Sequence, residues 1–426
     1  MVIAMHHLPR ALVLGLNYSP ETTGISPYTT AMARGLVNRG HAVRVVTAHP
    51  HYPQWKISPG YGEWSRREQV DGVIVDRKRH FVPNRPKPVP RAVSETSFGL
   101  RAATTRWGSP DAIVAVSPAL ISSTIARLRA ALTHRSVPFV VWVQDLYGLG
   151  VAETGQGSQT AARAIGRMEA WLLRSADAVV VIHQRFADRI HRDFGVPIKR
   201  IVVIRNWTHL PPMPAVDVDA TRQKFGWPRD EVVVVHSGNM GVKQGLQHVV
   251  QAGRLSALRD ARVRFVLIGD GSHREELERL AGEQPASVQF MAPLDDGDFP
   301  AALQAADVLL VNELPGVSEM AVPSKLTSYF AASRPVIAAT DLAGITADEV
   351  RAAGAGIVVP AGEPEALLDG VIRLTADEQA CKTYGENGRH YRETVLDETS
   401  AIDRFGSLLA NLTAGVSTTA TTAEAR

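Results

Sequence analysis

Short runs of apolar and β-branched residues recur along the whole chain, and segments with helical periodicity lie between them. Uniformly apolar runs of this kind are typical of strands that are covered on both faces of a sheet. Because helical segments separate the strands, we expect parallel pairing through helical crossovers. The sequence therefore predicts an α/β fold with two consecutive open, doubly wound sheets. The expected strands are residues 11–16, 42–47, 73–76, 112–116, 138–143, 178–182 and 201–204 in the first half, and 232–236, 263–268, 288–290, 307–311, 335–339 and 356–359 in the second.

The length of 426 residues also predicts two domains with separate cores. Hydrophobic residues make up 45% and charged residues 21%, which is typical of a soluble globular enzyme and excludes disorder and a coiled coil. The Pro-rich segment 209–219 is interpreted as part of a linker. The expected organisation is a Rossmann-like domain at 1–208, a linker at 209–225, a second Rossmann-like domain at 226–390, a helix at 391–414 that packs back on the first domain, and a disordered tail at 415–426.

Cysteine content and hydropathy restrict the class of protein further. The single cysteine, Cys381, excludes an internal disulfide and a cysteine-built metal site. The first nine residues contain no apolar run of signal-peptide length, and no run of 18 uncharged apolar residues occurs along the chain. We therefore expect a cytoplasmic protein without a membrane-spanning segment.

The two halves of the chain carry opposite net charge. Residues 1–205 hold 27 Lys and Arg against 13 Asp and Glu, a net charge of +14, whereas residues 206–426 have a net charge of −11. This asymmetry predicts a polyanionic partner, for which an anionic membrane face and a nucleic acid are both eligible. A solvated basic face without a partner is the alternative. The positive charge is densest at Arg66, Arg67, Arg77, Lys78, Arg79, Arg85, Lys87 and Arg91.

Loops at the carboxyl ends of the strands are the candidate functional segments, because ligands bind there in open α/β sheets. Two such domains facing each other across a cleft would hold one substrate each and exclude water on closure. Gly24 follows the first expected strand and precedes a helix, where it allows close approach of an anion or forms an ordinary turn. Asp145 follows the strand at 138–143, where its carboxylate orients a sugar hydroxyl, acts as a base or caps a helix.

The loop after the strand at 232–236 contains Gly238, Asn239 and Lys243. Its backbone N–H groups and the ammonium group of Lys243 suit a diphosphate, although a solvated loop lysine would have the same pattern. Gly269 begins a tight Gly-Asp-Gly turn, which we interpret as structural, with its backbone at most next to a base or ribose.

A second anion site is predicted further along the same half. Glu313 follows the strand at 307–311, and Ser324 and Lys325 open a helix whose N-terminus attracts anions. Two anion-binding helix starts in one half are what a nucleoside diphosphate requires. No G-x-G-x-x-G motif occurs in the first loop, and the only Asp-x-Asp motif, at 217–219, lies in the expected linker. We therefore expect neither a nicotinamide cofactor nor a metal.

Several longer strings resemble one known family. SGNMGVKQGL, GDG and VPSKLTSYFAASRPVIA resemble the nucleotide-binding half of retaining GT-B glycosyltransferases of the family 4-like type, which build bacterial capsular, exopolysaccharide and O-antigen chains. NYSPETTGISPYTTAMARGLVNRGHAVRVVTAHPHYP and VWVQDLYGLG resemble the acceptor domain of the same group. The resemblance covers about residues 11–410 and implies a GT-B fold, in which the first domain binds the acceptor and the second the nucleotide-sugar.

The resemblance also implies roles for individual residues. In the first loop the chain has Thr23 before Gly24 where many relatives have two glycines, and Asn239 stands where an arginine is common. Met320 and Ser328 occupy the positions at which many relatives carry two glutamates. The implied catalytic residues are Asp145, Lys243 and Glu313, and the implied donor-binding residues are Gly24, Gly238, Asn239, Lys243, Gly269, Ser324 and Lys325.

The function implied by the resemblance is transfer of a hexosyl group from a nucleotide-sugar donor to an acceptor hydroxyl, with retention and without a metal. The expected acceptor is a lipid-linked or cell-envelope polysaccharide intermediate, and the basic residues at 66–91 would dock on the inner face of an anionic membrane. A soluble small-molecule acceptor is the alternative within this class. A non-enzymatic polyanion binder is a further alternative, but it leaves the two anion loops without a role, and nucleic acid is not an expected partner.

Overall fold

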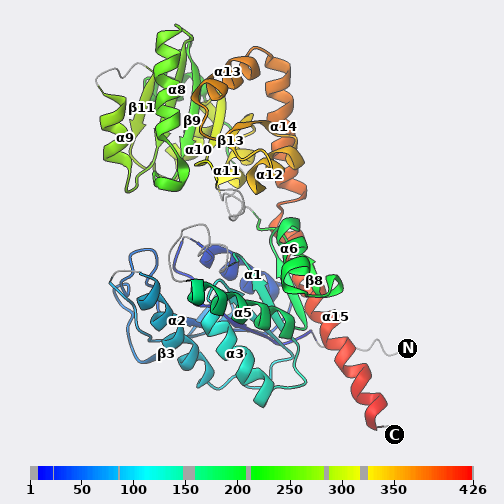
Figure 1. Cartoon of the computed structure of the whole chain (residues 1–426). Coiled ribbons are helices and arrows are strands. Elements are labelled where there is room, and N and C mark those ends of the chain that lie inside the picture. Colours follow the sequence, from blue (N-terminus) through cyan, green and yellow to red (C-terminus); the bar gives the residue numbers. More distant parts are fainter. Residues whose placement is uncertain are drawn as a thin grey trace. The chain divides into compact units, whose positions relative to one another are not determined.

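The computed structural model describes residues 8–22, 24–84, 87–146, 159–207, 213–282, 287–316 and 325–424. The chain forms two compact units, each with its own sheet and its own buried core (Figure 1). The first unit comprises Met1–His209 and Glu398–Arg426, and the second comprises Leu210–Asp397. Among the described residues, no helix is both long and apolar enough to cross a membrane.

The first unit is built on an eight-stranded sheet with helices on both faces. Its strands are β1 (Ala11–Leu14), β2 (Val43–Ala48), β3 (Ser65–Val70), β4 (Val73–Lys78), β5 (Ala112–Ser117), β6 (Phe139–Val143), β7 (Ala178–Val181) and β8 (Ile201–Val203). Its helices are α1 (Ser26–Asn38), α2 (Pro88–Ala103), α3 (Leu120–Thr133), α5 (Gln159–Ser175), α6 (Gln184–Phe194), the short 3-10 turn η1 (Ile198–Arg200) and α15 (Glu398–Glu424).

The strand order in this sheet is β3-β4-β2-β1-β5-β6-β7-β8. All neighbouring strands pair in parallel except β3 and β4, as the apolar runs predict. The sequence analysis did not predict β3, because its residues are charged and alternate between exposed and partly buried positions. This pattern belongs to an edge strand that is open on one side.

The second unit is built on a six-stranded, fully parallel sheet. Its strands are β9 (Val232–Ser237), β10 (Val263–Ile268), β11 (Val288–Met291), β12 (Val308–Asn312), β13 (Val336–Thr340) and β14 (Gly356–Pro360), in the order β11-β10-β9-β12-β13-β14. Its helices are α7 (Val218–Phe225), η2 (Val242–Gln244), α8 (Gln247–Leu258), α9 (Arg274–Ala281), α10 (Asp298–Ala305), α11 (Lys325–Ala331), α12 (Ile345–Ala353), α13 (Pro364–Thr375) and α14 (Glu378–Thr394). All six expected strands are present, and their order is that of a dinucleotide-binding sheet.

The second half of the expected linker at 209–225 is helix α7, which packs in the second unit. Asp217 caps its N-terminus by accepting a hydrogen bond from the backbone N–H of Ala220. The side chain of Arg222 is buried, pairs with Asp307 at 2.6 Å and donates to the carbonyl of Ala305. The interpretation of this segment as a linker overlooked these cap and core contacts, which anchor α7 beside β12.

The C-terminal part of the chain returns to the first unit at Glu398 rather than at residue 391. Helix α14 remains in the second unit, and α15 is the helix that packs on the first, in agreement with the expected return of the chain. Helix α15 continues to Glu424, although the sequence predicts disorder from residue 415.

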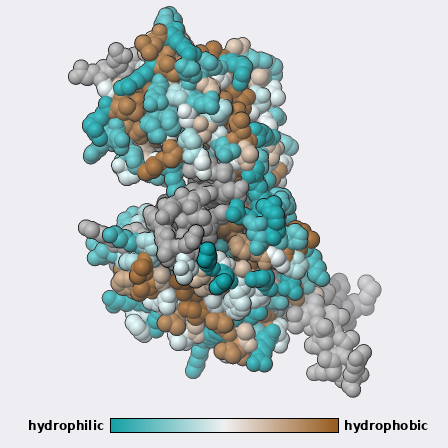
Figure 2. Space-filling model, viewed as in Figure 1, coloured by the Kyte–Doolittle hydropathy of each residue, from teal (hydrophilic) through white to brown (hydrophobic). Residues whose placement is uncertain are grey.

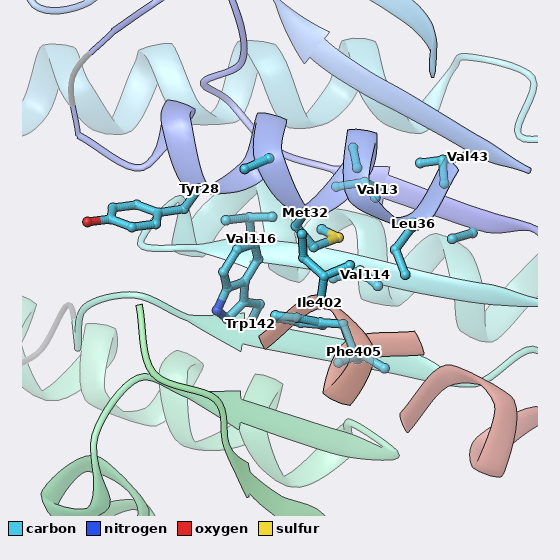
Figure 3. Close-up of a cluster of buried hydrophobic side chains, with 14 of the residues drawn as sticks. Val13, Tyr28, Met32, Leu36, Val43, Val114, Val116, Trp142, Ile402 and Phe405 are labelled. Carbon is cyan, nitrogen blue, oxygen red and sulfur yellow. The ribbon is translucent and has the colours of Figure 1, made fainter. Parts of the chain in front are cut away.

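Helix α15 fills a gap in the core of the first unit. Figure 3 shows Ile402 and Phe405 of α15 against Met32 of α1 and Trp142 of β6. A Cβ on Gly35 would lie 2.2 Å from Cδ1 of Ile402, so the glycine leaves the space that this side chain occupies. The rings of Phe405 and Trp142 meet edge to face with centroids 4.8 Å apart. The last ordered helix of the chain is therefore part of the N-terminal core.

We expect Phe405→Ala to lower the free energy of unfolding of the first unit by about 3–5 kcal/mol, because a fully buried aromatic ring is replaced by a cavity. Calorimetry should show the first unit melting at a lower temperature while the transition of the second unit stays in place. Leu258→Ala is the control, since Leu258 is 83% exposed and its removal should change stability by less than about 0.5 kcal/mol. Unchanged melting of the Phe405 variant would contradict the packing of α15.

Candidate functional site

The strand order of the second sheet reverses between β9 and β12, which is where ligands bind in sheets of this kind. Helix α11 begins at this point and is fixed by Tyr329, whose ring is fully buried. The Tyr329 hydroxyl accepts a hydrogen bond from the backbone N–H of Ser237 at 2.9 Å and donates to the carbonyl of Leu310 at 3.2 Å. Lys325 lies one helical turn before Tyr329, so this anchor also places Lys325 at the end of β9.

The ammonium group of Lys325 contacts a side chain near the end of β9. Its Nζ lies 3.2 Å from Nε2 of His236, a fully buried side chain. Burial, together with the positive charge of Lys325, holds the pKa of His236 well below its usual range, so the neutral imidazole accepts the hydrogen bond. Burial lowers the pKa of Lys325 to about 7, against the opposing effect of the Glu313 carboxylate. An anion bound beside Nζ would favour the charged ammonium.

Glu313 directly follows β12 and is held by two hydroxyl groups. Thr340, at the end of β13, donates to one carboxylate oxygen, and Thr346 of α12 donates to the other at 2.7 Å. Burial raises the pKa of Glu313, although both hydrogen bonds and the nearby Lys325 favour the charged form. The carboxylate is therefore fixed in position at the same edge of the sheet as Lys325.

The loop after β9 approaches the neighbouring turn through bare backbone. Gly238 and Gly269 have φ angles of +118° and +143°, a region that favours glycine. A Cβ on Gly269 would lie 1.9 Å from the carbonyl oxygen of Gly238, so no other residue fits there. A Cβ on Gly238 would lie 3.9 Å from Nζ of Lys325. The structure thus places Gly238 next to Lys325, and Gly269 lets the two turns pack closely.

Asn239 and Lys243 lie on the same loop. The Asn239 side chain fits between two glycines, since a Cβ on Gly271 would be 2.7 Å from its Oδ1 and one on Gly241 would be 2.9 Å from its Nδ2. Lys243 is exposed in the turn η2, and its carbonyl accepts a hydrogen bond from the backbone N–H of Leu314 at 2.8 Å. This bond ties the loop of Lys243 to the segment that carries Glu313.

The side chain of Asn312 ties the same two segments together. Its Nδ2 donates to the carbonyls of Gln244 and Gly245, at 2.8 and 3.1 Å. Lys243 and Lys325 were both predicted as phosphate-binding cations, and Lys325 is the one that lies beside Gly238. Ser324 lies outside the described residues. His236, Thr340 and Thr346 were not predicted. The signal for His236 in the sequence is that a polar residue ends the apolar run at 232–236.

In the first unit, Glu21 joins the loops that follow β1 and β2. Its Oε1 accepts hydrogen bonds from the backbone N–H groups of His51 at 2.7 Å and Tyr52 at 2.9 Å. Gly24 has a φ of +66°, and a Cβ there would lie 3.3 Å from the ring of Tyr52. Gly24 is thus placed at the carboxyl edge of the first sheet, as predicted, and the buried carboxylate of Glu21 holds this edge together.

Further polar groups line the same edge. The buried rings of His51 and His80 have centroids 4.9 Å apart, and neither ring nitrogen of His80 has a hydrogen-bond partner among the described residues. Burial lowers the pKa of His80 to about 3, and burial raises the pKa of Glu95 on α2 to about 7. Asp145 follows β6 at this edge, as predicted, next to the buried Gln144. The two histidines and Glu95 were not singled out from the sequence.

The basic segment at 66–91 does not form one exposed surface. Arg77 is buried, pairs with Glu68 at 2.5 Å and donates to the carbonyl of Ser19. Lys78 is buried as well, and burial lowers its pKa. Arg67 pairs with Asp76 across the antiparallel strands β3 and β4.

The predicted surface therefore loses Arg77 and Lys78, because β4 lies inside the sheet and these consecutive side chains are buried on its two opposite faces. Arg66 also has acidic partners, with its Nε 3.0 Å from Glu68. Three members of the predicted set are exposed and lie outside β3 and β4: Arg79, Lys87 and Arg91. Arg85 lies outside the described residues.

Comparisons with known proteins match each unit to a glycosyltransferase family. Residues 23–207 match the family described as glycosyl transferase 4-like domain, and residues 217–391 match glycosyl transferases group 1. The chain is 32% identical over 411 residues to the putative colanic acid biosynthesis glycosyl transferase WcaI of Escherichia coli (strain K12), a match that covers 93% of this chain and 98% of the relative.

Solved structures share the fold of the whole chain. Sucrose-phosphate synthase from Thermosynechococcus elongatus matches with a TM-score of 0.68 at 19% identity, over 95% of this chain and all of that one. Anabaena HepE in complex with UDP-glucose matches with a TM-score of 0.66 at 16% identity, over 94% of this chain and 99% of that one. The chain therefore belongs to the GT-B glycosyltransferases of the cell-surface polysaccharide type.

Proposed function

We propose that this glycosyltransferase transfers a hexosyl group from a nucleotide-sugar donor to an acceptor hydroxyl, with retention at the anomeric carbon. The observation that carries the proposal is the position of Lys325, whose ammonium group lies beside Gly238 where the strand order reverses. The complex of HepE with UDP-glucose supports a donor of this class, because that protein has the same fold.

The leaving group of such a transfer is a nucleoside diphosphate, whose developing negative charge has to be stabilised. Lys325 supplies an ammonium group in a fixed place, and its lowered pKa means that an anionic ligand is needed to hold it fully charged near neutral pH. Lys243 supplies a second, exposed ammonium group on the loop that begins at Gly238. Together these residues suit the donor phosphates.

In the proposed reaction, the bond between the anomeric carbon and the phosphate oxygen breaks while the acceptor oxygen bonds to the same face of that carbon. A phosphate oxygen of the donor accepts the proton of the acceptor hydroxyl, so no protein nucleophile is required. Glu313, whose two carboxylate oxygens are engaged by Thr340 and Thr346, positions the donor side of the site. The two lysines supply the positive charge that a divalent ion supplies in metal-dependent enzymes. We propose that this transfer needs no metal ion.

We propose a lipid-linked intermediate of cell-envelope polysaccharide synthesis as the acceptor, used at the cytoplasmic face of the membrane. The relationship to a protein named for colanic acid biosynthesis supports this choice. Asp145 and the pair of His51 and His80 offer polar groups at the carboxyl edge of the first sheet that suit acceptor hydroxyls. The positive net charge of the first half suits an acceptor that carries phosphate.

Lys325→Ala should weaken binding of the donor nucleotide by about ten- to a hundredfold, because a charge-assisted hydrogen bond contributes about 1.5–3 kcal/mol. The measurement is a thermal-shift titration with UDP-, GDP- and dTDP-sugars. Lys243→Ala should cause a smaller loss, because that side chain is exposed, and Lys382→Ala on α14 is the matched control. Wild-type affinity in the Lys325 variant would contradict the placement of the phosphates, and a wild type that no nucleotide stabilises would contradict the donor class.

The affinity for the nucleotide should fall as pH rises above 7. The free protein loses the proton of Lys325 near pH 7, whereas a bound diphosphate raises the pKa of this ammonium group, so binding takes up a proton at higher pH. We expect up to about a tenfold loss of affinity per pH unit between pH 7 and 9, measured by calorimetric titration. Lys325→Arg keeps its charge throughout and should show a flat profile; a flat wild-type profile would contradict the role of Lys325.

Turnover should be unaffected by EDTA, and the new glycosidic bond should have the anomeric configuration of the donor. Both are measured in one assay, with product configuration determined by NMR of the anomeric proton. A lipid-linked acceptor should react faster than the same sugar free in solution. Loss of turnover with EDTA, an inverted product or a preference for the free sugar would each contradict the corresponding part of the proposal.

A further inference from the structure

We infer that the outward faces of α2 and α3 dock the protein on an anionic lipid leaflet by inserting apolar side chains between basic ones. The inference rests on the proposed lipid-linked acceptor and deepens it, because it centres the membrane contact on α2 and α3 and retains only Arg79, Lys87 and Arg91 of the basic set that the sequence suggested. Figure 2 shows hydrophobic side chains gathered over the part of the first unit formed by α2 and α3.

Helix α2 is apolar on two opposite faces. Its inner face is buried and includes Phe98 and Ala102. Its outer face carries Val89, Val93 and Leu100, which are 74%, 49% and 55% exposed. Spacings of four and seven residues place these three side chains on one stripe of the helix. An ordinary surface helix has polar residues on this side, so the outer stripe needs an apolar partner.

Helix α3 continues the apolar surface. Leu128 and Leu132 are both more than half exposed, and Ile121 and Ile125 lie partly exposed on the same stripe, at spacings of three and four residues. The two helices are in close contact, since a Cβ on Gly99 of α2 would lie 2.8 Å from Cδ1 of Ile125. The two stripes therefore belong to neighbouring helices of one surface.

Aromatic side chains extend this surface beside α2. Trp64, 68% exposed, precedes β3, and the guanidinium group of Arg101 stacks on its ring at 3.8 Å. The same guanidinium group donates to the carbonyl of Trp64 at 2.6 Å. Phe81 is also exposed, and its backbone N–H donates to Ser97 of α2 at 3.0 Å. Tryptophan paired with arginine suits the boundary between headgroups and acyl chains.

The outward faces of α2 and α3 carry no acidic side chain. The only acidic residue on α2 or α3 is Glu95, and its side chain is buried. Five basic residues are exposed on or near the two helices. Arg79 and Lys87 precede α2, Arg91 lies in its first turn, Arg106 follows it, and Arg135 follows α3.

This combination favours a lipid leaflet over a protein partner. A leaflet supplies acyl chains for the apolar stripes and anionic headgroups for the cations, and neither requires a matched shape. One weak membrane-binding element gives only marginal binding to a membrane, whereas an apolar stripe and a polybasic rim together give stable binding. The burial of Arg77 and Lys78 does not affect this surface, because it depends on Arg79, Lys87 and Arg91.

The test is flotation of the full chain with phosphatidylcholine vesicles that contain or lack phosphatidylglycerol. Wild type should bind only the anionic vesicles. Val93→Glu combined with Leu132→Glu should weaken binding at least tenfold, because two carboxylates face the acyl chains. Leu258→Glu is the control, since Leu258 is a more exposed apolar residue on the second unit.

A second set of variants tests the charge. Changing Arg79, Lys87 and Arg91 to glutamine should weaken binding about a hundredfold, or about fivefold for each cation. Changing Arg373, Lys382 and Arg404 to glutamine removes the same charge from other exposed positions and should leave vesicle binding within about threefold of wild type.

Three outcomes would overturn the inference: wild type that ignores anionic vesicles, equal binding to both vesicle types, or a Val93 and Leu132 variant that binds like the Leu258 control. Nucleotide binding, measured by thermal shift on the same samples, separates this inference from the proposed function. Variants that lose vesicles but keep the nucleotide support the docking surface. Vesicle binding by a protein that binds no nucleotide would instead contradict the proposed function and leave the docking surface intact.

Discussion

The hydroxyl group of Tyr329 connects the parts of the second unit on which the candidate site depends. It bonds to the backbone of β9 through Ser237 and to that of β12 through Leu310, at the point where the strand order of the sheet reverses. The same side chain fixes α11, and with it the ammonium group of Lys325. Because this hydroxyl is fully buried, its loss would leave unpaired polar groups inside the sheet as well as a displaced cation.

Uniform apolar runs were sufficient to predict the parallel strands, because burial on both faces demands them. The same reasoning missed β3, whose charged residues pair across an edge, and α7, whose anchor is the ion pair between Arg222 and Asp307. Strand β3 pairs with the adjacent β4 across the two-residue turn at Asp71 and Gly72, which is a local signal that apolar runs do not contain. The pair that anchors α7 joins residues distant in sequence, and hydrophobicity along the chain carries no information about such a partner.

The candidate site was likewise predictable only in part. Loop positions placed Gly24, Asp145 and Glu313 at carboxyl edges, since this follows from strand direction alone. Which of the cations are buried could not be predicted, because the residue type alone does not determine burial. Arg77 pairs with Glu68 inside the first unit, and Lys325 contacts His236 inside the second, and the sequence around neither residue shows these partners. His80 and Glu95 gained their importance only from the packing around them.

The return of α15 to the first unit means that this unit is built from two separate segments of the chain. The second unit is an insertion that begins near residue 210 and ends near residue 397. Helix α15 then packs in the core of the first unit through Ile402 and Phe405. Ile402 and Phe405, which complete the core of the first unit, follow the whole of the second unit in the chain. During synthesis the first unit therefore cannot complete its core before the second unit has been made.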